Sequence, residues 1–140
     1  MAKKFNGTLD TKVLDKLIKH LDGNVEQAIA SAAFMVEGRA KVNAPVDTGA
    51  LRASIYVSMK RGGKASEAMA AAKARRPEAN VNALPEPRDN FTAHVGPSVE
   101  YGMEVELGSA TRGGTPYLGP ALRQTEKDLR DLLGKAVQDK

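Results

Sequence analysis

The most constraining feature of this sequence is a dense run of turn and capping residues at positions 43–55, between a helical pattern and a strand pattern. Pro45 prevents a preceding helix from continuing and biases the residue before it toward extended backbone. Gly49 then permits a tight backbone. The remaining capping and anchoring residues of this corner are Asp47, Thr48, Leu51 and Arg52. The run therefore predicts a built corner that leads from a helix into a strand.

Two short segments alternate apolar and polar side chains, which is typical of half-buried strands. The first spans residues 54–60 and the second spans residues 91–95. We predict that the two strands pair antiparallel and that residues 61–90 form their long connection. The sequence therefore indicates a small antiparallel sheet in the middle of the chain.

Helical periodicity occupies both ends of the chain. An apolar stripe at residues 13–21 predicts a short amphipathic helix, and Gly23 within Asp22-Gly23-Asn24 predicts its end. A second, longer helix then presents a face rich in alanine, which we expect to pack on the core or on a neighbour. A two-turn helix is expected from Val99 to a stop at Gly108, and Pro120 fits the first turn of a final helix. The predicted fold class is α+β, with helices at both ends of one domain, residues 1–140.

Residues 61–90 read as an insertion that forms a long, mobile, basic loop. Glycine, proline and charge dominate its outer parts, and residues 65–74 favour a helix but carry few large apolar side chains. The basic excess is concentrated in residues 60–76, which hold the single acid Glu67. The candidate contacts for DNA or an acidic partner are Lys60, Arg61, Lys64, Lys73, Arg75 and Arg76. The alternative, an ordinary solvated loop, stays open.

No residue pattern in the sequence predicts catalysis, a cofactor or a metal. Cysteine is absent, and His20 and His94 stand in no metal-ligand spacing. Glu100 and Glu104 share a helical face while Glu106 points elsewhere, so three carboxylates need not converge. The glycine tract at 108–115 lacks the lysine of a phosphate loop. We therefore expect that the protein is not an enzyme.

The corner also takes part in a resemblance that covers nearly the whole chain. Together with blocks at 101–108 and 116–122, it is similar to the tail-component family of long-tailed bacteriophages, which are head-tail joining, neck or tail-completion proteins. The residues outside the corner that carry it are Tyr101, Glu104, Glu106, Gly108, Pro116, Tyr117 and Pro120. These and the corner residues are expected to shape the subunit or an interface. Arg52 is a candidate partner of Glu104 or Glu106, within or between subunits.

The resemblance implies a structural virion protein of the neck or tail end, acting as connector, tail-completion protein or tail terminator. It implies a homo-oligomeric ring, a hexamer or dodecamer, around the DNA channel, with other neck, connector or tail-tube proteins as partners and non-specific DNA contact in the channel. No stretch approaches the roughly 18 apolar residues of a membrane span, so synthesis in the host cytoplasm is expected. The alternative is a small basic nucleic-acid-binding or regulatory protein.

Overall fold

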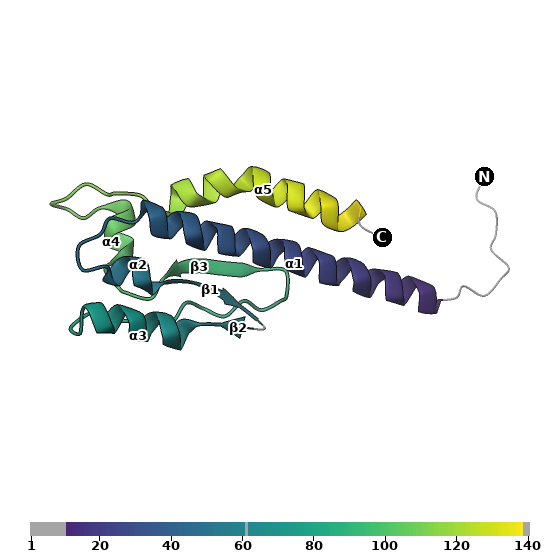
Figure 1. The fold of residues 1–140 in the computed structure, drawn as a ribbon, viewed down its shortest axis with the longest axis horizontal. Coiled ribbons are helices and arrows are strands. Elements are labelled where there is room, and N and C mark those ends of the chain that lie inside the picture. The colour runs from purple at the N-terminus through teal and green to yellow at the C-terminus, as the bar shows by residue number, and fades with distance from the viewer. Residues whose placement is uncertain (1–10, 61, 139–140) are drawn as a thin grey trace.

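The computed structural model describes residues 11–60 and 62–138. A long helix forms its spine, with the C-terminal helix along one side and a small sheet along the other (Figure 1). In chain order the elements are α1 (Thr11–Asn43), α2 (Ala50–Ser54), β1 (Ile55–Met59), β2 (Gly62–Gly63), α3 (Ala65–Arg75), β3 (Ala93–Pro97), α4 (Gly102–Leu107) and α5 (Leu118–Gln138). The N-terminal and C-terminal helices and the antiparallel sheet confirm the predicted α+β class.

Helix α1 is continuous over 33 residues, so the predicted break at Asp22-Gly23-Asn24 is wrong. Gly23 keeps an ordinary helical backbone, because only Gly49 and Gly108 have a positive φ among the described residues. A glycine inside an exposed helix costs only about 1 kcal/mol. A tertiary contact at the next residue helps to offset that cost. The Asn24 side-chain amide donates to the Ala136 carbonyl of α5 over 3.4 Å.

The corner after α1 forms much as predicted, with one additional element. Pro45 follows the end of α1, and the chain turns through Gly49, whose φ is +84°. The Ala50 N–H then donates to the Thr48 hydroxyl over 3.2 Å, so Thr48 rather than Asp47 is the observed capping side chain. The short helix α2 follows before the strand begins. The corner is thus a helix–turn–helix–strand junction.

The sheet has the strand order β2-β1-β3, and both pairings are antiparallel. The predicted pairing of the two longer strands is confirmed, with Val57 opposite Val95 at its centre. The second strand begins two residues later than expected, because Phe91 lies in a turn. The Phe91 backbone N–H donates to the Asp89 carboxylate over 2.8 Å. β3 is an edge strand of this sheet.

Both faces of β1 are buried, although its sequence alternates. Ile55 on one face belongs to the core that includes Val36 and Ala40 of α1. On the other face, the Tyr56 hydroxyl accepts from the Leu84 N–H over 2.6 Å and the Ser58 hydroxyl donates to the Pro85 carbonyl over 3.3 Å. The polar side chains of β1 therefore anchor the chain that follows α3.

This anchoring gives residues 62–90 more contacts than their composition predicts. Residues 65–75 form the 11-residue helix α3, which packs on α2 through the buried residues Ala68 and Ala72. The following stretch runs beside Val99, where Val81 forms an isolated antiparallel bridge, and the Glu100 N–H donates to the Asn80 carbonyl over 3.0 Å. Small alanine side chains allow this close packing. The mobility expected for this segment in solution stays a prediction.

The two remaining predicted helices are confirmed. α4 ends at Gly108, whose φ of +88° lies in the region that favours glycine. α5 holds Pro120 in its first turn, as expected. The core lies where α1, α2, β1 and the start of α5 meet, and Tyr117 is its largest fully buried side chain.

Candidate assembly surfaces

Glu106 is the centre of the junction that joins α4 to α5. Its carboxylate accepts three backbone N–H groups at the start of α5, from Tyr117 over 2.7 Å and from Leu118 and Gly119 over 2.9 Å each. The free N–H groups of a helix N-terminus favour such an anion. Burial opposes the charged form of Glu106, but the three donors and nearby Arg123 outweigh it, so the pKa of Glu106 lies below its ordinary value. Glu106 therefore ties the start of α5 to α4.

Tyr117 completes this junction from inside the core. Its side chain is fully buried, and its hydroxyl donates to the Gly102 carbonyl over 2.9 Å. Burial raises the pKa of Tyr117, with a further contribution from the charge of Glu106. Gly102 lies so close that an added Cβ would stand 2.4 Å from the Pro97 side chain. Sequence reasoning selected Glu106 and Tyr117 separately, and the structure brings them into direct contact.

The corner residues meet Tyr101 in a shallow pocket of about 250 Å³. The Arg76 guanidinium lies 5.0 Å from the centre of the Tyr101 ring and also binds the Glu78 carboxylate over 3.0 Å. Arg76 therefore packs against its own subunit. The pocket is lined by Pro45, Val46, Asp47, Thr48, Gly49, Ala50, Leu51, Arg76, Tyr101, Val105 and Arg112. It is smaller than usual small-molecule sites, which hold about 300–1,000 Å³.

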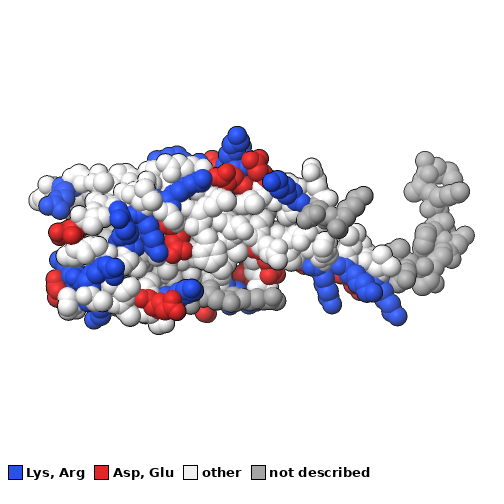
Figure 2. All heavy atoms as spheres, in the orientation of Figure 1, with Lys and Arg blue, Asp and Glu red and all other residues white. Residues whose placement is uncertain are grey.

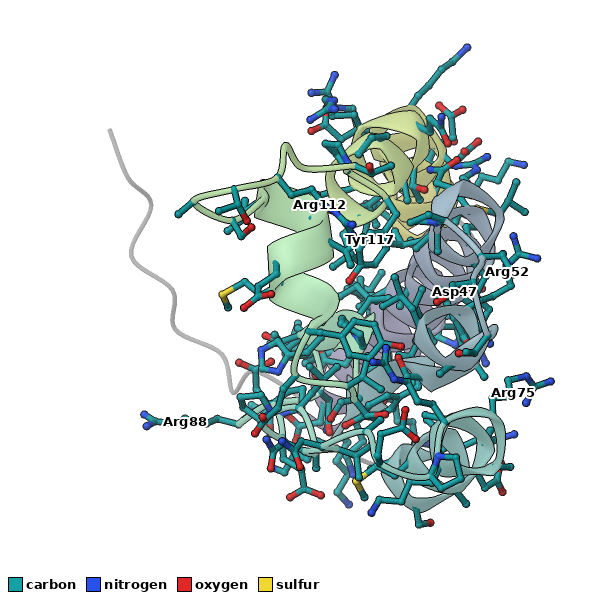
Figure 3. All side chains as sticks on the ribbon, turned by 90° about the vertical axis from the view of Figure 1, so that its left-hand side faces the viewer. Asp47, Arg52, Arg75, Arg88, Arg112 and Tyr117 are labelled. Atoms are coloured by element: carbon teal, nitrogen blue, oxygen red, sulfur yellow. The ribbon has the colours of Figure 1, made fainter. Side chains whose placement is uncertain are left out.

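Arg52 does not form the predicted pairing within one subunit. Its guanidinium donates to the Ala44 carbonyl over a long 3.5 Å, while Glu106 binds α5. Glu104 lies on the exposed side of α4 beside Arg76 and Tyr101. Figure 3 shows Arg52 pointing outward from the molecule. Pairing of Arg52 between subunits stays a prediction.

The loop at residues 108–116 projects beyond α4 (Figure 1). Its base is closed by an antiparallel bridge between Gly108 and Gly113, and the Thr115 N–H donates to the Val105 carbonyl over 2.7 Å. Pro116 and the residues from Ser109 to Thr115 are exposed. The loop is therefore an exposed protrusion on a closed base.

The basic residues separate into two groups. Lys60 and Lys64 are exposed near the end of β1, whereas Lys73 and Arg75 are exposed at the far end of α3. Arg75 and Arg52 point outward on the same side of the molecule (Figure 3). Figure 2 shows Lys and Arg side chains mixed with Asp and Glu over the end that holds α2, α3 and α4. Arg61 lies outside the described residues, so the six basic residues do not form one demonstrated patch.

Two uncovered apolar surfaces were not predicted as such. The first, here called the stripe, is the N-terminal part of α1, where Val13, Leu14, Leu17 and Ile18 are 68%, 45%, 53% and 46% exposed. The sequence indicated this stripe but assigned it to an ordinary amphipathic helix. The α1 helix carries it past the end of α5 (Figure 1).

The second surface, here called the groove, lies between α5 and the edge strand β3, with α1 as its floor. It encloses about 670 Å³, and the side chains that line it are mostly apolar. Its lining residues are Ile29, Ala32, Ala33, Val36, Phe91, Ala93, His94, Val95, Leu118, Gly119, Leu122, Thr125, Glu126, Leu129 and Leu133. The leucines of α5 were the only signal in the sequence, because the groove depends on how α5 sits beside β3.

Within the described parts of the chain, no group of three or more His, Asp or Glu side chains is arranged to hold a metal ion. No described helix combines the length and the apolar character that spanning a bilayer requires. The distinctive features of the described surface are thus the stripe, the groove, the corner pocket and the projecting loop.

Comparison with protein families gives one match, to the family described as bacteriophage HK97-gp10, putative tail-component, over residues 11–108. The matched range runs from α1 to the end of α4, so it includes the corner and the 101–108 block but not the 116–122 block. Comparison with curated proteins and with solved structures finds no significant match. Because the family match covers most of the sequence, the chain belongs to this family of bacteriophage tail components.

Proposed function

We propose that the protein is a structural subunit of the phage neck or tail end that assembles into a ring around the DNA channel. The observation that carries the proposal is the stripe, four large apolar side chains between 45% and 68% exposed in a member of a tail-component family. Exposed apolar surface of this kind marks an interaction site in a soluble protein. The subunit therefore acts by binding partner subunits or proteins that cover the stripe. The roles of connector, tail-completion protein and tail terminator all require such binding.

A ring requires that each subunit present two different, complementary surfaces. Such heterologous contacts close on themselves when the rotation between neighbours is a fraction of a full turn. The stripe, the groove and the projecting loop lie at different places on the molecule, which supports contacts of this type. A hexamer or dodecamer is the proposed stoichiometry, with other neck, connector or tail-tube proteins above and below the ring.

Contact with DNA is proposed for exposed basic residues of α2 and α3. Arg52 and Arg75 point outward on one side (Figure 3), where they would face phosphates across a channel, and Lys73 is exposed in the last turn of α3. Arg76 is a poorer candidate, since it contacts Glu78 and Tyr101. Such contact would be weak, non-specific and dependent on salt.

The test is the mass of the purified protein by light scattering at low and high concentration, with electron micrographs of the same samples. Rings of one size support the proposal and give the symmetry. A protein that stays monomeric in both conditions and binds duplex DNA in a salt-dependent manner would instead favour a small nucleic-acid-binding protein. In that case, removing the charges of Lys73 and Arg75 would abolish the binding.

Residues 61–90 provide a second test of assembly. We expect this segment to gain protection when copies associate, because most of its described side chains are exposed in the single subunit. Amide hydrogen exchange of the monomer and of the assembled protein measures this directly. Equal exchange in both states would show that the segment takes no part in assembly.

A further inference from the structure

The stripe lies beyond the part of α1 that its own subunit covers. Asn24 of α1 contacts Ala136 near the C-terminal end of α5, and residues 11–21 continue past this point. At 1.5 Å per residue, this extension is roughly 16 Å long. The extension therefore carries its large apolar side chains into solvent, at a distance from the groove.

The groove has the lining that a helix with such a stripe needs. Leu122, Leu129 and Leu133 of α5 form one wall, and Ala93 and Val95 of β3 form the other. The floor includes Ile29 and Ala33 of α1, whose small or branched side chains leave room for a knob from outside. Ridges of side chains spaced three and four residues apart pack into grooves of the same spacing. The stripe has this spacing, since Leu17 and Ile18 follow Leu14 by three and four residues.

Charge complementarity selects the occupant of the groove. Glu126 is the single charged residue in the groove lining, and it belongs to the α5 wall. At 100° per residue along α1, Lys16 and His20 flank one edge of the stripe, while Asp15 and Asp22 flank the other. The edge of the stripe that carries Lys16 therefore matches the wall that carries Glu126. Both complementary surfaces are present on every copy of this chain.

We propose that the stripe of one subunit lies in the groove of the next subunit, with Lys16 beside Glu126 of its neighbour. This inference rests on the proposed function, because it specifies the subunit contact that a ring of this protein uses. The contact joins two different surfaces, so each subunit gives its helix end to one neighbour and receives a helix end from the other. The large apolar side chains of the stripe are then buried only in the assembly.

The test uses cross-linking, which the absence of cysteine makes specific. Two variants, Leu17→Cys and Leu129→Cys, are mixed and treated with a short bis-maleimide, and the cross-linked peptides are identified by mass after proteolysis. The matched control mixes Leu17→Cys with Leu107→Cys, since Leu107 is 74% exposed and lies outside the groove lining. We expect a cross-linked pair in the first mixture and at least tenfold less in the control.

The same samples are also measured by light scattering and imaged by electron microscopy. The results therefore test the stripe-groove contact and the ring separately. Rings without the Leu17–Leu129 cross-link would overturn the contact while leaving the proposed function intact, and would mean that another partner covers the stripe. Cross-linked pairs without rings would support the contact and contradict the ring. A monomer without cross-links at high concentration would overturn both.

Charge reversal gives an independent check. Lys16→Glu and Glu126→Lys should each weaken association about two- to fivefold, as expected for a partly exposed ion pair, and the double variant should recover to within about twofold of the original. Lys127→Glu is the matched control, because Lys127 is exposed on α5 but outside the groove lining. Additive losses in the double variant would overturn the pairing of Lys16 with Glu126.

Discussion

The two halves of α1 show how one helix can serve both the subunit and an assembly. In the C-terminal half, the buried positions are mostly small, with Ala28, Ala32, Ala33 and Ala40 at most 6% exposed. In the N-terminal half, the apolar positions are large, and Leu17 and Ile18 are about half exposed. The alanines therefore lie where α5 and the sheet pack closely on α1. The large side chains lie on a surface that the subunit itself leaves uncovered.

The contrast also explains why the helix is longer than its own fold requires. Most helical stability in proteins comes from packing of an apolar face, not from intrinsic propensity. The covered half is packed by α5, β1 and β3. The uncovered half is continuous with it, so the subunit holds the stripe in place before any partner binds.

Replacing Tyr117 by alanine should lower the free energy of unfolding more than any other change proposed for the covered half of α1. The fully buried ring lies beside the end of α1, where the Asn43 amide donates to the Tyr117 carbonyl over 3.4 Å. We expect Tyr117→Ala to lower the free energy of unfolding by about 3–5 kcal/mol in urea titrations. Tyr117→Phe removes only the hydrogen bond to Gly102 and should cost about 1 kcal/mol. A loss below 1 kcal/mol for the alanine variant would mean that Tyr117 does not hold this end of the core.

Removing the Glu106 carboxylate should loosen the attachment of α5 to the covered half. Glu106→Ala leaves three N–H groups without their acceptor, so we expect a loss of about 1–3 kcal/mol at neutral pH. Glu104→Ala, on the exposed side of the same short helix, is the control and should change stability by less than about 0.5 kcal/mol.

The pH dependence of the same group has a defined sign. Because the folded pKa of Glu106 is lowered from 4.5, its contribution is fully present above that value. It is lost as pH falls through the lower folded pKa. The carboxyl of the unfolded chain has the higher pKa, so acid protonates the unfolded state first and favours unfolding. The stability difference between the original protein and Glu106→Ala should therefore shrink below about pH 4.5. A difference that grows on acidification would contradict the carboxylate's role.

Replacing Gly23 by alanine tests whether the two halves are one helix. Apart from the adjacent residues and backbone of α1 itself, nothing lies within 4 Å of an added Cβ at this position, so we expect Gly23→Ala to raise the free energy of unfolding by about 0.5–1 kcal/mol. Gly49→Ala is the opposite case, because its φ is +84° and Arg75 lies 3.2 Å from the added atom, and it should destabilise. Destabilisation by Gly23→Ala would instead support the broken helix that the sequence indicated.

Shortening a side chain of the stripe should leave the isolated subunit almost unchanged. Leu17 is 53% exposed and alanine is a better helix former, so Leu17→Ala should alter unfolding of dilute monomer by no more than about 0.5 kcal/mol. Association, followed by light scattering, should weaken at least about tenfold. Leu107→Ala is the control for an exposed leucine elsewhere and should affect neither quantity. If Leu17→Ala associated as strongly as the original protein, the N-terminal half of α1 would not be an assembly surface.

Features with local causes were predicted well from the sequence. Pro45 and Gly49 mark the corner, Gly108 ends α4, and Pro120 lies in the first turn of α5 because each fits the backbone there. Alternation located the strands to within two residues. These residues act through their own backbone preferences, so no knowledge of the rest of the fold is needed.

Features that depend on tertiary contact were missed or misjudged. Gly23 suggested a helix end, but the contact of Asn24 with α5 keeps the helix continuous. The alanines of α3 suggested weak order, yet Ala72 is fully buried against its neighbours. Glu106 was selected as a residue of the subunit or of an interface, but its three backbone donors at the start of α5 were not predicted. The groove exists only because α5 and β3 flank α1.

Amide hydrogen exchange along α1, in the monomer and in the assembled protein, tests most directly whether the N-terminal half of α1 is covered only by assembly. We expect residues 28–43 to be protected in both states, while residues 11–21 exchange quickly in the monomer and at least about tenfold more slowly after assembly. Equal exchange of residues 11–21 in the two states would contradict it.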